Sequence, residues 1–155
     1  MTAPSQMGIK KVASNRKAFR DYFILERIEA GIALQGTEVK SLREGLVNLT
    51  GGYVMVDEGE AILHDVNVAP YEFGNRFNHE ATRPRRLLLH RKEIHKLVGQ
   101  VAQKGFTIIP LSLYFKQGKV KVEIGLCKGK QEIDKRETIK RKEADREAER
   151  ASKRR

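Results

Sequence analysis

The segment Tyr22–Leu34 reads YFILERIEAGIAL and gives the clearest indication of the fold in this 155-residue chain. Apolar residues alternate with charged ones along its middle, and β-branched and aromatic side chains are frequent, which is typical of a strand with one buried face. Gly31 interrupts the pattern, and a glycine inside a strand indicates a bulge or a bend. We therefore predict one long strand with a bulge or a bend at Gly31, either of which lets a strand curve round the corner of a small barrel.

Two further pairs of segments predict antiparallel hairpins, each with a glycine in the connecting turn. They are Tyr53–Val56 with Glu60–Val68 across Asp57-Glu58-Gly59, and Phe106–Phe115 with Val120–Cys127 across Gln117-Gly118. In the last of these strands the apolar and the charged residues alternate, so one face should be buried. The residues expected on that buried face are Val120, Val122, Ile124 and Leu126.

Two segments predict helices. The shorter, Gln35–Gly45, has Thr37 as a candidate N-cap and Gly45 as a candidate stop, which leaves about two turns between them. The longer, roughly Arg91–Lys104, repeats apolar residues at helical spacing and ends before Gly105.

These elements amount to about five or six antiparallel strands with no β–α–β alternation. The predicted fold class is mainly β: a small OB-like antiparallel barrel with flanking helices over its openings, followed by a basic, helix-prone C-terminal tail. We expect a flexible N-terminal arm over residues 1–14, the barrel over residues 15–127 and the tail over residues 128–155.

The tail contains 12 Lys and Arg residues against 7 Asp and Glu residues. Opposite charges at helical spacing favour a helix, but the only bulky apolar residues are Ile133 and Ile139, too few for a face that docks on the barrel. Because isolated helices of this length are marginal in water, we expect the free tail to be disordered and to become helical on a polyanion. The alternative is a solvated charged terminus without a role.

The formal net charge of +11 points to nucleic acid or to an anionic membrane surface. No apolar run approaches the roughly 18 residues that span a bilayer, and the tail lacks the apolar face of an interfacial helix, so we expect no membrane partner.

The single cysteine, Cys127, excludes an intrachain disulfide and favours a reducing compartment. Pro4 and Gly8 stand where a signal peptide would have an apolar core, and we therefore expect a cytoplasmic protein.

No set of catalytic or metal-binding residues is evident. His90 and His95 are five residues apart and no HExxH or cysteine pair accompanies them. The chain has no GxSxG, Walker loop or GxGxxG at a strand–helix junction. Cys127 lies at the end of an apolar alternation, where a structural role is the simpler interpretation. We predict no enzyme activity, no cofactor, no metal and no small-molecule substrate.

Cations and aromatic residues are instead distributed as in RNA-binding proteins. Pro70–Pro84, which reads PYEFGNRFNHEATRP, is too irregular for a strand and combines aromatic rings with asparagine and arginine. Some of its aromatic residues could equally belong to the core. The cations that we consider for RNA contact are Arg16, Lys17, Arg20, Lys40, Arg43, Arg76, Arg83, Arg85 and Arg86.

Several longer segments resemble the SsrA-binding protein family, small protein B. They are NRKAFRDYFI from Asn15, EAGIALQGTEVKSLREG from Glu29, PYEFGNRFNH from Pro70, RPRRLLLHRKEI from Arg83, and GLCKGK from Gly125 followed by DKR at Asp134. The resemblance runs from Asn15 into the tail in the family's order. It implies an OB-like barrel that binds the tRNA-like domain of transfer-messenger RNA (SsrA RNA) and accompanies it to stalled 70S ribosomes for trans-translation. It also implies that the tail enters the empty mRNA channel near the decoding centre, where it folds as a helix against small-subunit ribosomal RNA.

The resemblance also implies roles for individual residues. It places Asn15, Arg16, Glu29, Lys40, Arg43, Arg76, Asn78 and Leu88 at or beside the transfer-messenger RNA surface. A carboxylate repels phosphate, so Glu29 would accept hydrogen bonds from base edges or ribose hydroxyls, or orient an arginine. The residues that match the family's decoding-centre motif are Gly129, Lys130, Asp134, Lys135 and Arg136.

Three positions depart from the family's usual residues. Arg20 stands where histidine is frequent, Gln131 where a second lysine follows Gly129-Lys130, and Ile133 where tyrosine or histidine precedes Asp134. The alternative function is a general OB-fold translation factor that binds ribosomal RNA alone, and a nucleic-acid-modifying enzyme is disfavoured by the missing site.

Overall fold

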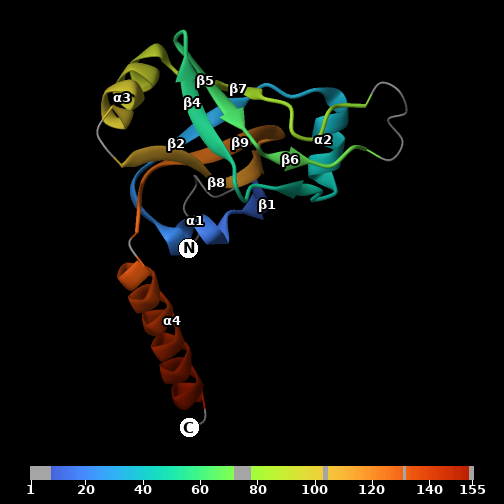
Figure 1. Ribbon diagram of the computed structural model, residues 1–155. Coiled ribbons are helices and arrows are strands. Elements are labelled where there is room, and N and C mark those ends of the chain that lie inside the picture. Colours follow the sequence, from blue (N-terminus) through green and yellow to red (C-terminus); the bar gives the residue numbers. More distant parts are fainter. Residues whose placement is uncertain (1–7, 72–77, 103–104, 131, 154–155) are drawn as a thin grey trace.

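The computed structural model describes residues 8–71, 78–102, 105–130 and 132–153, with only the backbone described for residues 132–138 and 151–153. Strands form a rounded body, and one long helix projects away from it (Figure 1). In chain order the elements are β1 (Ile9–Ser14), α1 (Arg16–Asp21), β2 (Tyr22–Ile32), α2 (Gly36–Arg43), β3 (Val47–Asn48), β4 (Tyr53–Asp57), β5 (Glu60–His64), β6 (Asn67–Val68), β7 (Arg85–Leu88), α3 (Arg91–Val101), β8 (Phe106–Lys116), β9 (Lys119–Gly129) and α4 (Glu132–Lys153).

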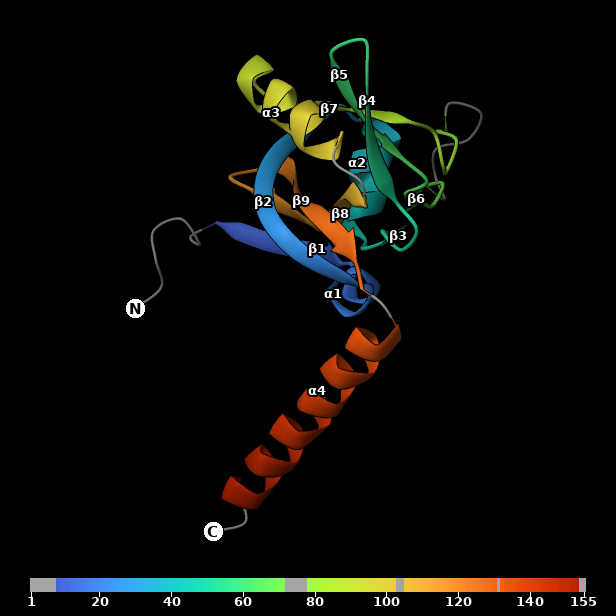
Figure 2. The same ribbon diagram turned by 60° about the vertical axis from the view of Figure 1, so that its left-hand side comes forward.

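The body is an antiparallel barrel, which confirms the predicted fold class. In the described residues, the sheet order is β1-β8-β4-β5-β7-β2-β9, and β8 also pairs with β9, so the pairings run right round the core. Two of the seams are short: β4 meets β8 at Val54 and Ile108, and β2 meets β7 over two residue pairs. The barrel is therefore OB-like, with a ring of pairings that two short seams complete. Helix α3 covers one side and α2 lies toward another (Figures 1 and 2).

The long strand β2 follows the prediction in length but not in the position of its irregularity. The register against β9 shifts between Ile24 and Glu26, so the bulge is at Leu25, whereas Gly31 pairs regularly with Lys121 of β9 and Leu88 of β7. Gly31 is instead a point of close approach between strands: a Cβ placed on it would lie 3.1 Å from the Cβ of Leu88. Of the two alternatives predicted at Gly31, the bulge is wrong, because the register shift lies at Leu25, and the bend stays a prediction.

Both predicted hairpins are present. Their turns have positive φ at both central residues, Glu58 (49°) and Gly59 (77°) in one, and Gln117 (52°) and Gly118 (79°) in the other, as two-residue type I′ turns require. The predicted strand Glu60–Val68 is divided, because Asp65 also has a positive φ (59°). Its second part becomes β6, which pairs with β3.

The core inside the barrel is formed by the alternating faces of these strands, and it includes Val122, Ile124 and Leu126 as predicted. A second, smaller cluster lies outside it, where Ala18 of α1 covers Ile109, Leu111 and Cys127. Burial raises the pKa of the Cys127 thiol to about 11. Cys127 is thus a buried structural residue, in agreement with the sequence interpretation.

The boundaries of the barrel differ from the prediction at both ends. Residues 9–14 form β1 on the edge of β8, so the expectation of a flexible arm is wrong for them; residues 1–7 lie outside the described residues. The lysine-rich β1 has little apolar alternation, and its strand conformation comes from backbone hydrogen bonds to β8. Strand β9 extends to Gly129, which moves the start of the tail past Lys128.

The tail residues Glu132–Lys153 form the helix α4, as their helix propensity predicts. Figures 1 and 2 both show α4 as a rod that extends away from the barrel. The disorder expected of the free tail stays a prediction. No helix in the described parts of the chain is long and apolar enough to cross a bilayer.

Candidate RNA-binding surface

The outer face of β2 carries a carboxylate held by side chains of β8. Glu29 accepts a hydrogen bond from the hydroxyl of Tyr114, and Nζ of Lys116 lies 3.4 Å from its Oε1. The hydrogen bond from Tyr114 and the nearby Lys116 lower the pKa of Glu29, while burial and the Glu29 carboxylate raise the pKa of Tyr114. Glu29 is therefore ionised at neutral pH, and its side chain remains 38% exposed, so it can accept further hydrogen bonds.

Leu88 and Lys121 lie beside this carboxylate on the same outer face. Ala30 and Ile32 of β2 are buried in the core, so Glu29 and Gly31 face outward because side chains alternate along a strand. Gly31 pairs with Leu88 on one side and with Lys121 on the other. We call Glu29, Leu88 and Lys121 the β2 strip. Leu88 is 49% exposed, so its side chain is available for an apolar contact.

Lys121 was not among the residues predicted from the sequence to form the site. The alternation in β9 assigned it only to a charged face, and no signal in the chain showed that this face continues across β2 to Glu29. The pairing of Gly31 with Lys121 supplies that information.

Helix α2 presents Lys40 and Arg43 to solvent, as predicted. Its N-cap is Gln35 rather than Thr37, and the Glu38 carboxylate accepts a hydrogen bond from the Gln35 amide in a capping box. Thr37 instead pairs its hydroxyl with Nδ1 of His79 at 2.9 Å. Lys40 and Arg43 stand in the last turn, where cations also favour the helix.

A buried ion network fixes α2 to β7. The Glu38 side chain is fully buried and bonds to Arg85, which is also fully buried, and to Nη2 of Arg83 at 2.5 Å. Burial opposes ionisation of Glu38, but hydrogen bonds from Arg83, Gln35 and Arg85 lower its pKa overall. Arg85 also donates to the carbonyls of Val66 and Ala81. Arg83 and Arg85, which the sequence suggested for RNA contact, are thus structural.

Two of the predicted site residues serve the fold through their side chains. Asn15 is only 2% exposed; it accepts from the amide of Ala18 to cap α1 and donates to the carbonyls of Leu49 and Pro110. The Asn15 side chain therefore serves the fold, because its polar atoms are buried and already bonded, and its place at or beside the RNA surface stays a prediction. Asn78 accepts from the amides of Tyr71 and His79 and donates to the Tyr71 carbonyl, which closes the loop between them.

The remaining barrel residues of the prediction are Arg16 and Arg76. Arg16 is exposed at the start of α1. Arg76 lies outside the described residues, together with the rest of 72–77.

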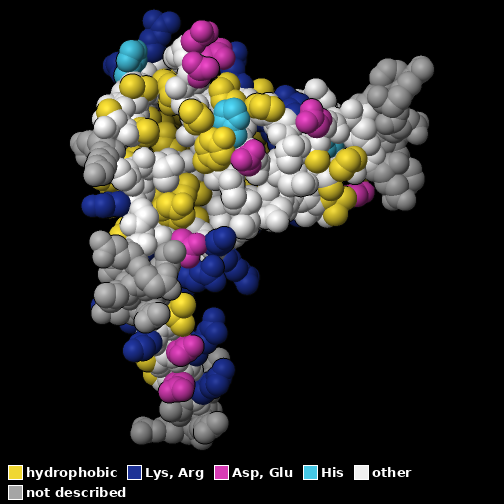
Figure 3. All heavy atoms as spheres, viewed as in Figure 1, with side chains coloured by type: hydrophobic (Ala, Val, Ile, Leu, Met, Phe, Trp, Pro, Cys, Tyr) yellow, Lys and Arg dark blue, Asp and Glu magenta, His cyan; other side chains and the backbone are white. Residues whose placement is uncertain are grey.

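The tail motif begins on the barrel and continues into α4. Gly129 is the last residue of β9, and the amide of Lys130 donates to the carbonyl of Asp21 at 2.8 Å. Nζ of Lys130 lies 5.0 Å from the ring centroid of Phe23, within cation–π range. Asp134, Lys135 and Arg136 lie in the first turns of α4. Figure 3 shows Lys and Arg side chains gathered where the tail joins the body and alternating with acidic ones along the helix.

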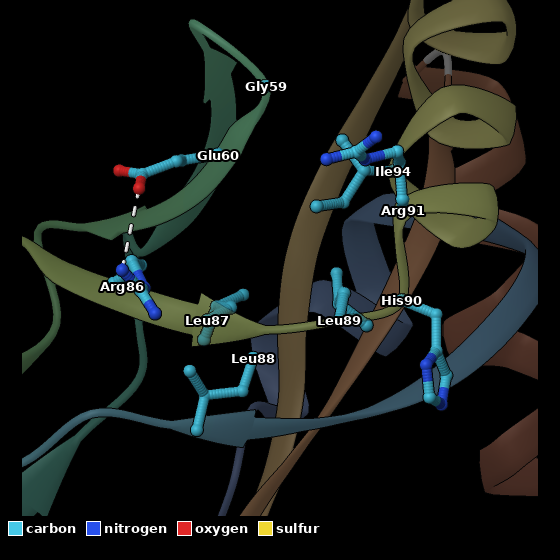
Figure 4. A pocket seen from close by; sticks show the side chains of 9 residues that line it. All are labelled: Gly59, Glu60, Arg86, Leu87, Leu88, Leu89, His90, Arg91 and Ile94. Atoms are coloured by element: carbon cyan, nitrogen blue, oxygen red, sulfur yellow. Dashed lines mark hydrogen bonds and ion pairs between the residues drawn. The ribbon is translucent and has the colours of Figure 1, made fainter.

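A cleft of about 460 Å³ lies between β5, β7 and α3. Figure 4 shows Glu60 and Arg86 on one side, joined by a 3.4 Å ion pair, with Arg91 and Ile94 of α3 on the other. The cleft shares Leu88 with the β2 strip. Its described lining contains no nucleophile paired with a base, and the described residues contain no group of three or more His, Cys, Asp or Glu that could hold a metal.

The barrel, the exposed β2 strip and the projecting basic helix define a small RNA-binding protein of the OB-like class. Comparison with known families makes this specific: the family model described as SmpB protein matches residues 12–154. The chain belongs to this family, whose members bind RNA.

Curated relatives match almost from end to end. The SsrA-binding protein of Pelobacter propionicus is 55% identical over 147 residues, covering 95% of this chain and 97% of its own. The SsrA-binding protein of Roseiflexus sp. is 59% identical over 145 residues, covering 93% and 92%. A solved chain, reported under the words "tmRNA-SmpB: a journey to the center of the bacterial ribosome", superposes with a TM-score of 0.67 at 47% identity, covering 82% of this chain and 93% of that one.

Proposed function

We propose that this protein binds the tRNA-like domain of transfer-messenger RNA and helps deliver it to stalled ribosomes in trans-translation. The observation that carries the proposal is the β2 strip, an ionised but exposed carboxylate beside an exposed leucine and a lysine on a barrel of the SmpB family. Relatives named for SsrA binding and the solved tmRNA–SmpB structure support the same partner.

The strip is suited to folded RNA rather than to phosphate alone. Glu29 can accept hydrogen bonds from ribose 2′-hydroxyls or base amino groups, which distinguishes it from a purely basic patch. Leu88 offers an apolar contact to a ribose or base, and Lys121 a charge for a phosphate. Lys40, Arg43 and Arg16 are further exposed cations of α2 and α1 that would contact phosphates of the same RNA, and Arg76 would add another.

For the tail we propose the role of a sensor of the empty mRNA channel. Gly129, Lys130, Asp134, Lys135 and Arg136 would contact small-subunit ribosomal RNA near the decoding centre. The exposed charged faces of α4 support this, since residues 139–150 have no face that packs on the barrel. Coupling the ordering of the tail to binding would make recognition conditional on a vacant channel.

The protein acts without catalysis in this proposal, as a cytoplasmic binding factor that needs no cofactor. The alternative remains a general OB-fold factor that binds ribosomal RNA alone. That general factor would require only phosphate contacts, which by themselves carry no sequence or shape information.

The test compares the affinity of the purified full-length chain for transfer-messenger RNA and for bulk elongator tRNA at physiological salt. We expect a clear preference for transfer-messenger RNA, which survives a rise in salt concentration. Equal affinities with the same steep salt dependence would reject the proposal in favour of the general factor.

A further inference from the structure

A basic groove lies between β1, the end of α2 and the β8–β9 turn, and of its cations only Arg43 belongs to the residues that the family resemblance placed at the RNA surface. We call it the β1–α2 groove; its volume is about 520 Å³. Val12, Leu42 and Phe115 give it an apolar floor, since all three pack in or against the barrel core. Lys10, Lys11 and Arg43 line it with positive charge.

Strand β1 holds the two lysines in place. Lys10 pairs with Phe115 and Lys11 with Tyr114 in the β1–β8 ladder, and the amide of Gln117 donates to the carbonyl of Gly8 at 3.3 Å. The backbone of both lysines is therefore fixed, while their side chains are exposed. A groove of this kind could not be found from the sequence, because it depends on β1 being a strand.

The cations of the groove differ from several others on the barrel, which form ion pairs with acidic side chains. Arg27, Arg86 and Lys96 form ion pairs with carboxylates of neighbouring elements. Among the described residues, no Asp or Glu oxygen forms an ion pair with the charged groups of Lys10, Lys11 or Arg43. The one acidic residue in the lining, Glu44, leaves a net positive charge.

We propose that the β1–α2 groove binds a ribose–phosphate backbone segment of the same RNA, which rests on the proposed function and extends its surface to β1. The three cations suit phosphates, and the apolar floor suits a ribose or the face of a base. The groove also lies next to the β2 strip, since Lys11 in its lining pairs with Tyr114, whose hydroxyl bonds to Glu29.

The experiment measures the affinity of full-length variants for the tRNA-like domain of transfer-messenger RNA over a range of salt concentrations. The groove variant is Lys10→Ala with Lys11→Ala. We expect it to bind about tenfold more weakly and to reduce the slope of log affinity against log salt by about two, one for each phosphate that the protein no longer neutralises. Lys10→Arg with Lys11→Arg should keep most of the affinity.

The charge-matched control, Lys92→Ala with Lys142→Ala, removes two exposed lysines of α3 and α4 and should change the affinity little.

Three outcomes would overturn the proposed RNA binding in the groove. They are an unchanged salt slope in the groove variant, an equal loss of affinity in the control, and failure of the Lys10→Arg, Lys11→Arg variant to preserve affinity. A failure of the proposed function appears separately, as equal affinity of the unsubstituted chain for transfer-messenger RNA and tRNA.

Acetylation of lysines in the unsubstituted chain, followed by mass spectrometry, gives a reading that does not depend on the folding of variants. RNA should protect Lys10 and Lys11 more than Lys92. Equal protection of Lys10, Lys11 and Lys92 by RNA overturns the proposal. Protection of Lys10 and Lys11 by an acidic polyglutamate peptide but not by RNA also overturns it, because that result would assign the groove to a protein partner.

Discussion

The side chain of Leu88 on β7 lies directly over Gly31 of β2, with its Cβ 3.1 Å and its Cδ1 3.3 Å from the position that a Cβ on Gly31 would occupy. The absence of a side chain at Gly31 lets Leu88 lie flat on the outer face of the barrel. Glu29, two residues earlier on that face, and Lys121, opposite Gly31, complete the β2 strip. The shape of the proposed RNA surface therefore depends on one glycine.

Gly31→Ala should disturb this surface more than the fold. The added methyl group would push Leu88 outward, and overpacking of this kind costs about 1–3 kcal/mol of stability. We expect a several-fold loss of affinity for transfer-messenger RNA in a binding titration, with a modest fall in melting temperature. Gly99→Ala on α3 is the matched control, since a Cβ there meets nothing within 4 Å; it should stabilise the helix by about 0.5–1 kcal/mol and leave RNA affinity unchanged. An unaltered RNA affinity of Gly31→Ala would contradict the RNA-binding role of the β2 strip.

Glu38→Gln should destabilise the barrel strongly. It would leave Arg85 buried without its anionic partner, which costs about 3–5 kcal/mol when one member of a buried pair is removed. Urea unfolding at pH 7 measures the loss. The control is Glu60→Gln, which breaks the exposed pair with Arg86 and should cost less than about 1 kcal/mol. Similar losses in the two variants would contradict the role of the Glu38 network.

The same network predicts a pH dependence. The pKa of Glu38 is lowered from its ordinary value of 4.5, so its stabilisation is fully present above that value and is lost as the pH falls through the lower, folded-state pKa. The unsubstituted chain should therefore lose more stability on acidification below about pH 4.5 than Glu38→Gln does. Parallel curves would show that Glu38 does not contribute.

Tyr114→Phe should raise the pKa of Glu29, because the hydrogen bond from the Tyr114 hydroxyl is the largest cause that lowers it. Carboxyl chemical shifts in an NMR titration would show the change. At pH 7 Glu29 remains ionised, so RNA affinity should fall much less than in Glu29→Gln, where loss of charge-assisted hydrogen bonds costs about 1.5–3 kcal/mol. An unchanged Glu29 titration would mean that the two groups are not bonded in solution.

Truncation of the tail should separate RNA binding from the action of the tail, provided that the truncated chain keeps all of β9. A chain that ends at Lys130 keeps the pairing of Gly129 with Tyr22 and the bond from Lys130 to Asp21. It should bind transfer-messenger RNA with nearly full affinity but fail to support peptide tagging on stalled ribosomes. A chain that ends at Cys127 lacks this strand pairing and this hydrogen bond and should melt at a lower temperature. Absence of RNA binding in the chain that ends at Lys130 would show that the tail is needed for it.

A peptide of residues 130–155 should be mostly coil by circular dichroism in buffer, because a helix of this length without a docking face is marginal in water. Addition of a structured ribosomal RNA fragment should increase its helicity. High helicity of the peptide alone would mean that α4 is preformed before binding.

Much of the architecture followed from local patterns in the chain. The alternation in Val120–Leu126 placed those residues on one buried face, and the glycines of the Gly59 and Gly118 turns positioned both hairpins. The positive charge and the segments that resemble small protein B indicated an RNA-binding protein. The length and charge pattern of the tail indicated a helix without a continuous apolar face.

Other features were set by the packing of segments that are distant in sequence. The family resemblance placed Asn15 at or beside the RNA surface, and the charge pattern suggested Arg85 for RNA contact. Folding buries both side chains, because their polar groups bond to carbonyls and a carboxylate of other elements. Strand β1 and its groove arise from pairing with β8, far along the chain, where Ser14 lies opposite Ser112. The meeting of Glu29, Leu88 and Lys121 likewise depends on which strands flank β2. Local sequence determines which residues can form a strand or a helix, whereas the neighbours that a side chain meets are determined by long-range pairing, which no local pattern encodes.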